Sequence, residues 1–130
     1  MNDRYLFKAI DTNSVWRTGL LIALKGNRCA IEESDGSKWA CDAKTLCQCT
    51  GLKDKNGKLI WENDICDRKE EYPEIVKYNN GDWTLDYSYS KGKESGYCYC
   101  NLGFYALERK CVEVIGNIFD NPELLESEEK

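Results

Sequence analysis

The chain has 130 residues, of which 42% are hydrophobic and 32% are charged, as in ordinary globular proteins. This length fits one domain, or one domain with a small appendage, and is enough to bury a core without disulfides. No run approaches the roughly 18 apolar residues of a membrane span. The opening MNDRYLFKAID lacks the basic-then-apolar layout of a secretory signal. We therefore expect no membrane association and a cytoplasmic location in the cell that makes the protein.

The net charge of −5 is unevenly distributed along the chain. The last twelve residues, FDNPELLESEEK, contain five acidic residues and one lysine, so this tail carries −4 and the rest of the chain only −1. A nearly neutral body argues against binding duplex DNA through a basic face. The tail is interpreted either as a solvated end or as a weak phosphate mimic that occupies a basic partner.

The chain has eight cysteines and no histidine. Because nothing marks the chain as secreted, we expect the cysteines to be free thiols that pack as small apolar groups. The lack of histidine removes the commonest general base and the commonest metal ligand.

The first part of the chain is typical of an antiparallel meander. Short apolar runs alternate with polar turn clusters, and they predict strands at residues 4–11, 15–24, 28–33 and 37–41. Residues 42–48, DAKTLCQ, follow as a candidate helical turn, with Asp42 as a possible N-cap.

The clearest pattern in the second part of the chain is WTLDYSYS, residues 83–90. Its strict alternation predicts a strand with one apolar face, and the preceding Asn-Gly predicts a tight hairpin to residues 74–79. A further strand is expected at residues 111–119, where Gly116 marks a bulge or a close approach. NPELLE predicts a short closing helix with Asn121 as its cap and Pro122 at its first position.

The connector TGLKDKNGKLIWENDI, residues 50–65, has two interpretations, a chemical site or a turn. Asn56-Gly57 is a strong hairpin signal, and the polar residues 62–64 predict a second corner. Two corners this close are typical of small, strongly bent barrels. A phosphate-binding loop would need the pattern GxxxxGK[ST] and a following helix, whereas strand-forming residues follow here. The sequence therefore predicts a turn.

This connector, together with EVIGNIFDNPELLE at residues 113–126, resembles the signature of the YopX family of bacteriophages and prophages. FKAIDTN followed by WRTGLLI is similar to the N-terminal opening of that family. The resemblance implies a small β protein with an SH3-like barrel in its C-terminal part, and a family without an established activity. No catalytic residue is carried over, and Cys47 and Cys49 stand where the family pattern would have polar or aromatic residues.

These observations together predict a mostly β fold. We expect a small antiparallel N-terminal meander at residues 1–49 and an SH3-like barrel at residues 50–120. A short helix with an acidic tail would follow at residues 121–130.

The best candidate for a metal site is the pair of C-x-C units, Cys47/Cys49 and Cys98/Cys100. Residues i and i+2 of a strand share a face, so each unit would offer two thiolates to a tetrahedral zinc. On a straight strand those ligands lie about 7 Å apart, which is too wide without a bend. We therefore predict plain buried thiols, with no cofactor and no metal.

Catalysis has a weak candidate in WENDICD, where Glu62, Asp64 and Asp67 would bind a hard cation or share a proton. Carboxylates at a corner and a strand start are commonly just solvated. The sequence therefore predicts a protein that is not an enzyme, with no catalytic residue.

Aromatic residues supply the candidate binding surface. The five residues are Trp83, Tyr87, Tyr89, Tyr97 and Tyr99. One interpretation is cross-strand packing in the core. The other is an exposed patch that contacts a peptide, stacked bases or another subunit.

For function, the sequence favours a non-enzymatic accessory protein of a phage or prophage, oligomeric, that binds a host or phage macromolecule, most simply a protein. The alternative is a protein that binds a small nucleotide such as a defence signal. A weak enzyme or metalloprotein is a third hypothesis. The partner, the ligand and the number of subunits do not follow from the residues.

Overall fold

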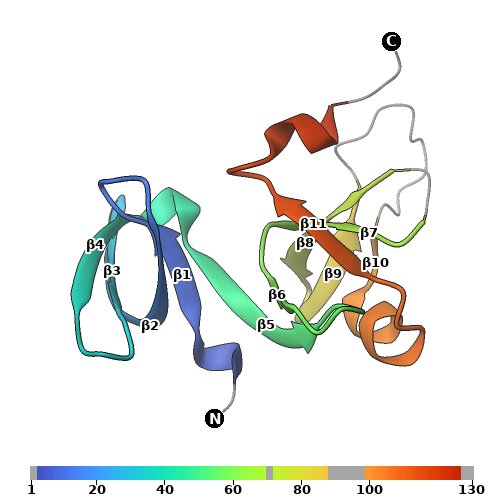
Figure 1. Ribbon diagram of the computed structural model, residues 1–130, viewed down its shortest axis with the longest axis horizontal. Helices are drawn as coiled ribbons and strands as arrows, with labels where there is room; N and C mark the ends of the chain where they lie inside the picture. The colour runs from blue at the N-terminus through green and yellow to red at the C-terminus, as the bar shows by residue number, and fades with distance from the viewer. Residues whose placement is uncertain (1–2, 70–71, 88–98, 127–130) are drawn as a thin grey trace. The chain divides into compact units, whose positions relative to one another are not determined.

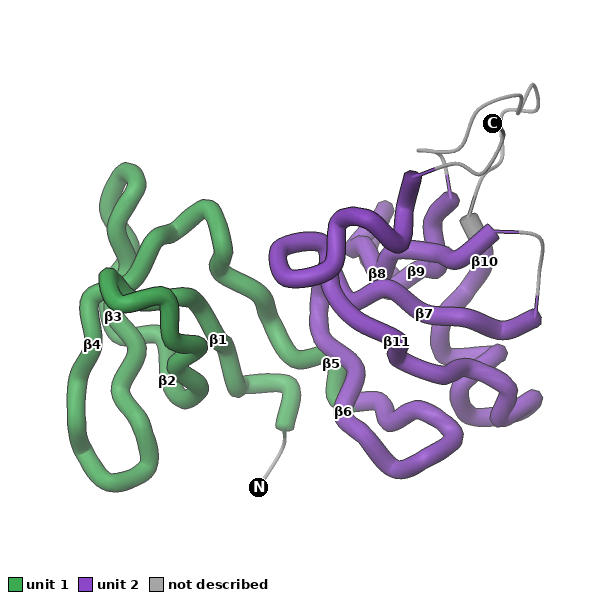
Figure 2. Tube along the Cα trace, turned by 45° about the horizontal axis from the view of Figure 1, so that its top comes forward, with its two compact units in different colours: residues 1–51 green, residues 52–130 purple. Residues whose placement is uncertain are grey.

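The computed structural model describes residues 3–69, 72–87 and 99–126. The chain divides into two compact units, residues 1–51 and residues 52–130 (Figure 2). Both are built from antiparallel strands with a few single helical turns. The expected mostly β fold is therefore confirmed. No helix among the described residues is both long and apolar enough to cross a membrane.

Unit 1 is a curled meander that starts with a single 3-10 turn, η1 (Asp3–Tyr5). Its strands follow one another along the chain as β1 (Phe7–Ile10), β2 (Trp16–Lys25), β3 (Arg28–Glu32), β4 (Lys38–Asp42) and β5 (Cys47–Lys53). Their order in the sheet is β4-β3-β2-β1-β5, and β6 is the next strand beyond β5 (Figure 1). The meander predicted from the sequence is therefore confirmed.

The curl of unit 1 comes from its long strand β2. The first half of β2 pairs with β1, and its second half pairs with β3 from Leu20 onward, with a register shift between Leu21 and Ala23. Gly19 lies where β2 passes from one partner to the other, and a Cβ there would collide with the carbonyl oxygen of Glu32. An isolated bridge from Asp11 to Cys41 then brings the chain after β1 to β4.

The core of unit 1 lies inside this curl. Its fully buried members are Ala9, Cys29, Ile31 and Cys41, with five partly buried apolar residues packed against them. The turn after β4 is η2 (Ala43–Thr45), and the Asp42 side chain accepts a hydrogen bond from the Lys44 backbone N–H at 2.9 Å. The helical turn and its predicted N-cap are both confirmed.

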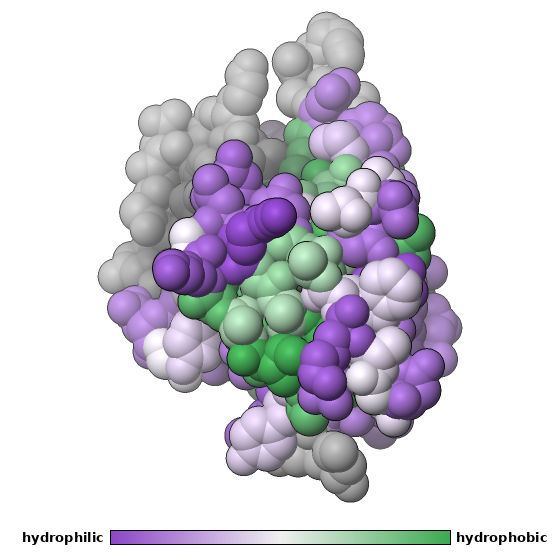
Figure 3. Space-filling view, turned by 90° about the vertical axis from the view of Figure 1, so that its left-hand side faces the viewer, coloured by the Kyte–Doolittle hydropathy of each residue, from purple (hydrophilic) through white to green (hydrophobic). Residues whose placement is uncertain are grey.

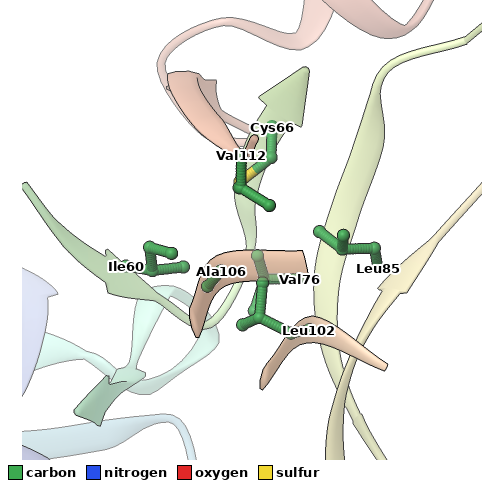
Figure 4. Packing of buried hydrophobic residues seen from close by; sticks show 7 residues of the cluster. All are labelled: Ile60, Cys66, Val76, Leu85, Leu102, Ala106 and Val112. Atoms are coloured by element: carbon green, nitrogen blue, oxygen red, sulfur yellow. The ribbon is translucent and has the colours of Figure 1, made fainter. Parts of the chain in front are cut away.

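Unit 2 is an open antiparallel sheet in the order β10-β9-β8-β7-β11 (Figure 1). Its elements are β6 (Leu59–Trp61), β7 (Asp64–Asp67), β8 (Glu74–Asn79), β9 (Asp82–Asp86), β10 (Tyr99–Asn101), the π-helical turn η3 (Phe104–Glu108), β11 (Glu113–Asn117) and the 3-10 turn η4 (Pro122–Leu125). Figure 4 shows its core, which is formed by Ile60, Cys66, Val76, Leu85, Leu102, Ala106 and Val112.

Three local predictions for unit 2 are confirmed. Asn80 and Gly81 both have positive φ between β8 and β9, as the tight hairpin requires. Leu85 is fully buried in the core, and Trp83, two residues before it, packs against that core. The register of β11 against β7 shifts just before Gly116, where a Cβ would collide with the Asn121 side chain, so this glycine is both a bulge position and a close approach.

The connector at residues 50–65 is a pair of turns, as predicted. The Asp54 N–H donates to the carbonyl oxygen of Lys58 at 2.8 Å, and Gly57 has a φ of 83°. The Asp54 side chain is 6% exposed and accepts hydrogen bonds from three backbone N–H groups, those of Asn56, Lys58 and Val114, each at 2.9 Å. At the second corner, Asn63 has a positive φ.

The SH3-like barrel predicted for residues 50–120 is not confirmed, because neither sheet closes on itself in the described part of the chain. β10 and β11 are the two edges of the unit 2 sheet. β6 is the neighbour of β5 in the other sheet, whereas β7 lies between β8 and β11. The second corner of the connector, between β6 and β7, therefore marks the change from one sheet to the other.

Candidate functional site

The candidate site is a groove in unit 1 with a volume of about 720 Å³. It is formed by Leu6, by the middle of β2, by the end of β3 and by the turn that follows β3. The lining residues are Leu6, Thr18, Gly19, Leu20, Glu32, Glu33, Ser34, Asp35 and Gly36. Its size lies within the range of sites that take small ligands or short peptide segments.

Backbone geometry explains why a groove forms here. Gly19 packs so closely against the backbone at Glu32 that no side chain fits between the strands. The turn after β3 is fixed by the Glu33 N–H, which donates to the Ser37 carbonyl oxygen at 2.8 Å. The Ser37 N–H in turn donates to the Asp35 carboxylate at 2.9 Å, and Gly36 has a φ of 91°. The groove walls are therefore held by the main chain.

The chemistry of the groove is apolar with an acidic wall. Leu20 is 48% exposed although it is aliphatic, and Leu6 lines the groove as well. Glu32, Glu33 and Asp35 supply carboxylates, and the lining contains no lysine or arginine. Such a surface attracts cations and repels phosphate groups.

Asp35, one of the carboxylates on this wall, is charged at neutral pH. The side-chain hydroxyl and the backbone N–H of Ser37 lower the pKa of Asp35 below its usual value. Glu33 accepts a hydrogen bond from the Trp39 indole N–H at 2.9 Å and lies 3.8 Å from the Arg17 guanidinium. Arg17 itself stacks on the Trp39 ring and pairs with Asp11 at 2.8 Å, so its charge is shared between two carboxylates.

From the sequence, Glu32 and Glu33 end a predicted strand and residues 34–36 form the turn that follows, so no site is expected on this wall. A signal is present, because three of the four residues before Gly36 are acidic. What the sequence did not reveal is that Leu6 and Leu20, from two other segments, line the same space.

The structure describes only part of the aromatic set predicted as a binding surface. Trp83 packs against the core of unit 2, and its ring meets Tyr78 edge-on at 5.1 Å. Tyr87 is half-buried. Tyr99 begins β10 and pairs with Asp86. Tyr89, Tyr97 and the side chain of Tyr99 lie outside the described part of the chain. A common binding surface for all five therefore stays a prediction.

The candidate catalytic carboxylates make backbone contacts. Asp64 is buried and accepts a hydrogen bond from the Trp61 N–H at 2.8 Å, which closes the second corner of the connector. Asp67 accepts one from the Lys69 N–H at 2.9 Å. Glu62, the third candidate, is half-buried. Over residues 3–69, 72–87 and 99–126, no three Asp, Glu, His or Cys side chains are placed to hold a metal ion.

Every cysteine that the structure describes is a free thiol, and Cys98 lies outside the described residues. Cys47 and Cys49 are buried in unit 1, whereas Cys100 is half-buried in unit 2. Burial raises the pKa of Cys66 well above its usual value. Burial and the neighbouring Cys29 raise that of Cys41 to about 11. These two thiols stay protonated at neutral pH and are poor nucleophiles.

A buried ion pair in unit 2 was not anticipated from the sequence. The Arg68 guanidinium contacts Glu74 at 2.8 and 3.2 Å, and both side chains are almost fully buried. Arg68 also stacks on the Tyr105 ring and donates to the Cys100 sulfur at 3.1 Å. This network joins β7, β8, β10 and η3, so we interpret it as part of the framework of unit 2.

Comparison with solved structures finds proteins whose fold is similar to that of this chain. The chain is similar to protein EF1440 from Enterococcus faecalis, with a TM-score of 0.55 and 25% identity, over 92% of this chain and 96% of that one. It is also similar to protein yopX from Bacillus subtilis, with a TM-score of 0.57 and 23% identity, over 97% of this chain and all of that one. No curated protein matches the chain.

A family model described as YopX protein matches residues 8–126. That match covers most of both units, including the connector, the closing turn η4 and the groove except for Leu6, and it confirms the resemblance seen in the connector and in residues 113–126. The chain belongs to the YopX family.

Proposed function

We propose that this protein is a non-enzymatic accessory protein of a phage or prophage that acts in the host cytoplasm. It binds a protein of the host or of the phage through the groove of unit 1. The occupant is a short segment that carries lysine or arginine next to an aliphatic side chain. The aliphatic side chain packs on Leu6 and Leu20, and the cationic group pairs with Glu33 or Asp35.

The observation that carries this proposal is the combination of an exposed leucine and three acidic residues in the lining of one groove. An exposed aliphatic side chain is ordinary by itself. In a lining that has three acidic residues and no lysine or arginine, it forms a surface with a definite chemical complement, because apolar contact supplies affinity and charge supplies specificity.

The groove favours a protein over the alternative of a small nucleotide. A nucleotide site needs donors for phosphate oxygens, such as arginine, lysine or a helix N-terminus. The lining instead offers carboxylates, which repel phosphate. A positively charged peptide segment satisfies both the acidic wall and the apolar side chains.

The test is titration with an uncapped probe peptide that alternates lysine and leucine, followed by the backbone amide signals of the protein. We expect the largest shifts at residues 18–20 and 32–36. Replacing Glu33 by Gln together with Asp35 by Asn keeps the hydrogen-bond acceptors and removes two charges. At about 0.2–1 kcal/mol per exposed pair, this change should weaken binding by about 2- to 25-fold.

The matched control is Glu123→Gln with Glu126→Gln, which removes two exposed charges of unit 2 and should leave the affinity unchanged. A glutamate-leucine peptide is the second control and should not bind. Equal weakening by both double variants would mean that the peptide responds only to net charge, and the proposed site would then be wrong.

A further inference from the structure

The outward side of β3 and β4 forms a second surface with its own pattern, which we call the outer face. Alternate residues of a strand share one face, and the buried Cys29, Ile31 and Cys41 define the inner one. The outer face therefore carries Arg28, Ala30 and Glu32 of β3 and Lys38, Ala40 and Asp42 of β4. Figure 3 shows this side of the molecule, where a hydrophobic centre is bordered by hydrophilic residues.

The centre of the outer face is apolar and flat. Ala40 pairs with Ala30, and Ala30 pairs with Ala23 of β2, so three alanines lie in one row across the sheet. Ile22, the extra residue at the register shift of β2, is 44% exposed beside this row. Small side chains let the backbone of another sheet approach to the usual distance of about 10 Å.

The charges around this centre alternate in sign. Arg28 lies opposite Asp42 at one end of the face, and Lys38 lies opposite Glu32 at the other end. Along β3 the sign therefore changes from positive to negative, and along β4 it changes from negative to positive. The four charges form a square in which neighbouring corners are opposite.

This square is complementary to itself under a two-fold rotation. An axis that runs across the strands at the alanine row places Arg28 over Glu32 of a second copy and Lys38 over Asp42 of that copy. The same rotation places Ile22 and the alanines over their own counterparts. A two-fold interface requires such self-complementarity.

We infer that the outer face is the contact between two copies of this chain, related by a two-fold axis across β3 and β4. An axis along the strands would also pair opposite charges. That axis would leave Ile22 and Ala23 uncovered, because β4 is the edge of the sheet. The axis across the strands buries β2, β3 and β4 together, so it removes more apolar surface from water.

The test is sedimentation equilibrium over a range of protein concentrations. The wild type should be a concentration-dependent dimer. Variant A, Glu32→Lys with Lys38→Glu, keeps the net charge and keeps opposite charges paired within the chain. Across the proposed interface, this variant places Arg28 of one copy against the lysine introduced at position 32 of the other copy. It likewise places Asp42 against the glutamate introduced at position 38. Like charges in contact should raise the dimer dissociation constant at least about tenfold.

Variant B, Arg28→Glu with Asp42→Lys, should also lose association alone. An equimolar mixture of A and B should form a dimer, because every contact across the proposed axis is then between opposite charges. An axis along the strands predicts the reverse, since variants A and B would then each dimerise alone and no A–B dimer would form in the mixture.

Variant B loses the side-chain cap of η2, so its fold is checked by circular dichroism. Ala40→Glu leaves that cap in place, puts charge in the apolar centre and should give a monomer. A wild type that stays monomeric at several hundred micromolar would overturn the inference. So would an Ala40→Glu variant that associates normally, or a mixture of A and B that remains monomeric.

Discussion

Replacing Asp54 tests whether the connector is a turn held by one buried carboxylate. Asp54→Ala removes the acceptor of three backbone N–H groups at once. The N–H groups of Asn56 and Lys58 lie on exposed residues, where water replaces the lost acceptor, whereas Val114 lies in β11 and is half-buried. The main cost therefore comes from Val114.

The size of the effect follows from these three contacts. A hydrogen bond to a charged group contributes about 1.5–3 kcal/mol, and a buried donor left without a partner costs about 1–3 kcal/mol. We expect Asp54→Ala to lower the free energy of unfolding by about 2–4 kcal/mol. Asp54→Asn keeps the oxygen that accepts from the Asn56 and Lys58 N–H groups, but it places the amide NH2, a donor, against the Val114 N–H, which is also a donor. It should therefore cost about 1–3 kcal/mol.

The assay is urea denaturation, combined with hydrogen exchange at the Val114 amide. Because the chain has two compact units, exchange is needed to place the loss in unit 2. Asp67→Ala is the matched control. It removes a similar side-chain contact to a backbone N–H at a more exposed position, and should cost less than about 1 kcal/mol. A loss below about 1 kcal/mol for Asp54→Ala, with Val114 still protected, would refute the reasoning.

Three further predictions concern stability. Burial would raise the pKa of Asp54, but its three backbone hydrogen bonds lower it overall, and the pKa of Asp11 is lowered chiefly by the Val15 N–H and by Arg17. The stabilisation of the folded state by these two carboxylates is complete above the pKa of an unfolded aspartate, about 4. It is lost as the pH falls through the lower pKa values that the two groups have in the folded protein. Acid titration of the melting temperature should show a steeper fall for the wild type than for Asp54→Asn. Gly19→Ala should cost more than the usual 1–3 kcal/mol of overpacking in urea denaturation, because its Cβ meets backbone, and an unchanged midpoint would contradict the close approach. Arg68→Met should cost about 3–5 kcal/mol because it removes the guanidinium that contacts the buried Glu74 carboxylate, and the double change with Glu74→Leu should recover most of this loss if the buried charge is the cause.

Local chemistry in the sequence predicted local structure well. The Asn-Gly turns, the Asp42 cap and the close approach at Gly116 each depend on a few adjacent residues, so the sequence contains the whole signal. The alternation through Trp83 and Leu85 also predicted which side of β9 meets the core.

Long-range pairing was not predictable in the same way. Whether β6 joins β5 or closes against another strand depends on contacts between distant residues, and the same two corners fit both outcomes. The groove shows the same limit, since Leu6, Leu20 and the acidic turn are brought together only by the curl of β2. The π-helical η3 has no apolar periodicity long enough to predict it.

The central claim, that the groove of unit 1 binds a cationic aliphatic segment, is tested most directly by mapping amide shifts during titration with the lysine-leucine peptide. The account predicts saturable shifts at residues 18–20 and 32–36 that weaken in the variant with Glu33→Gln and Asp35→Asn. Shifts that spread over both units, or that stay equal in this variant and in the unit 2 control, would contradict it.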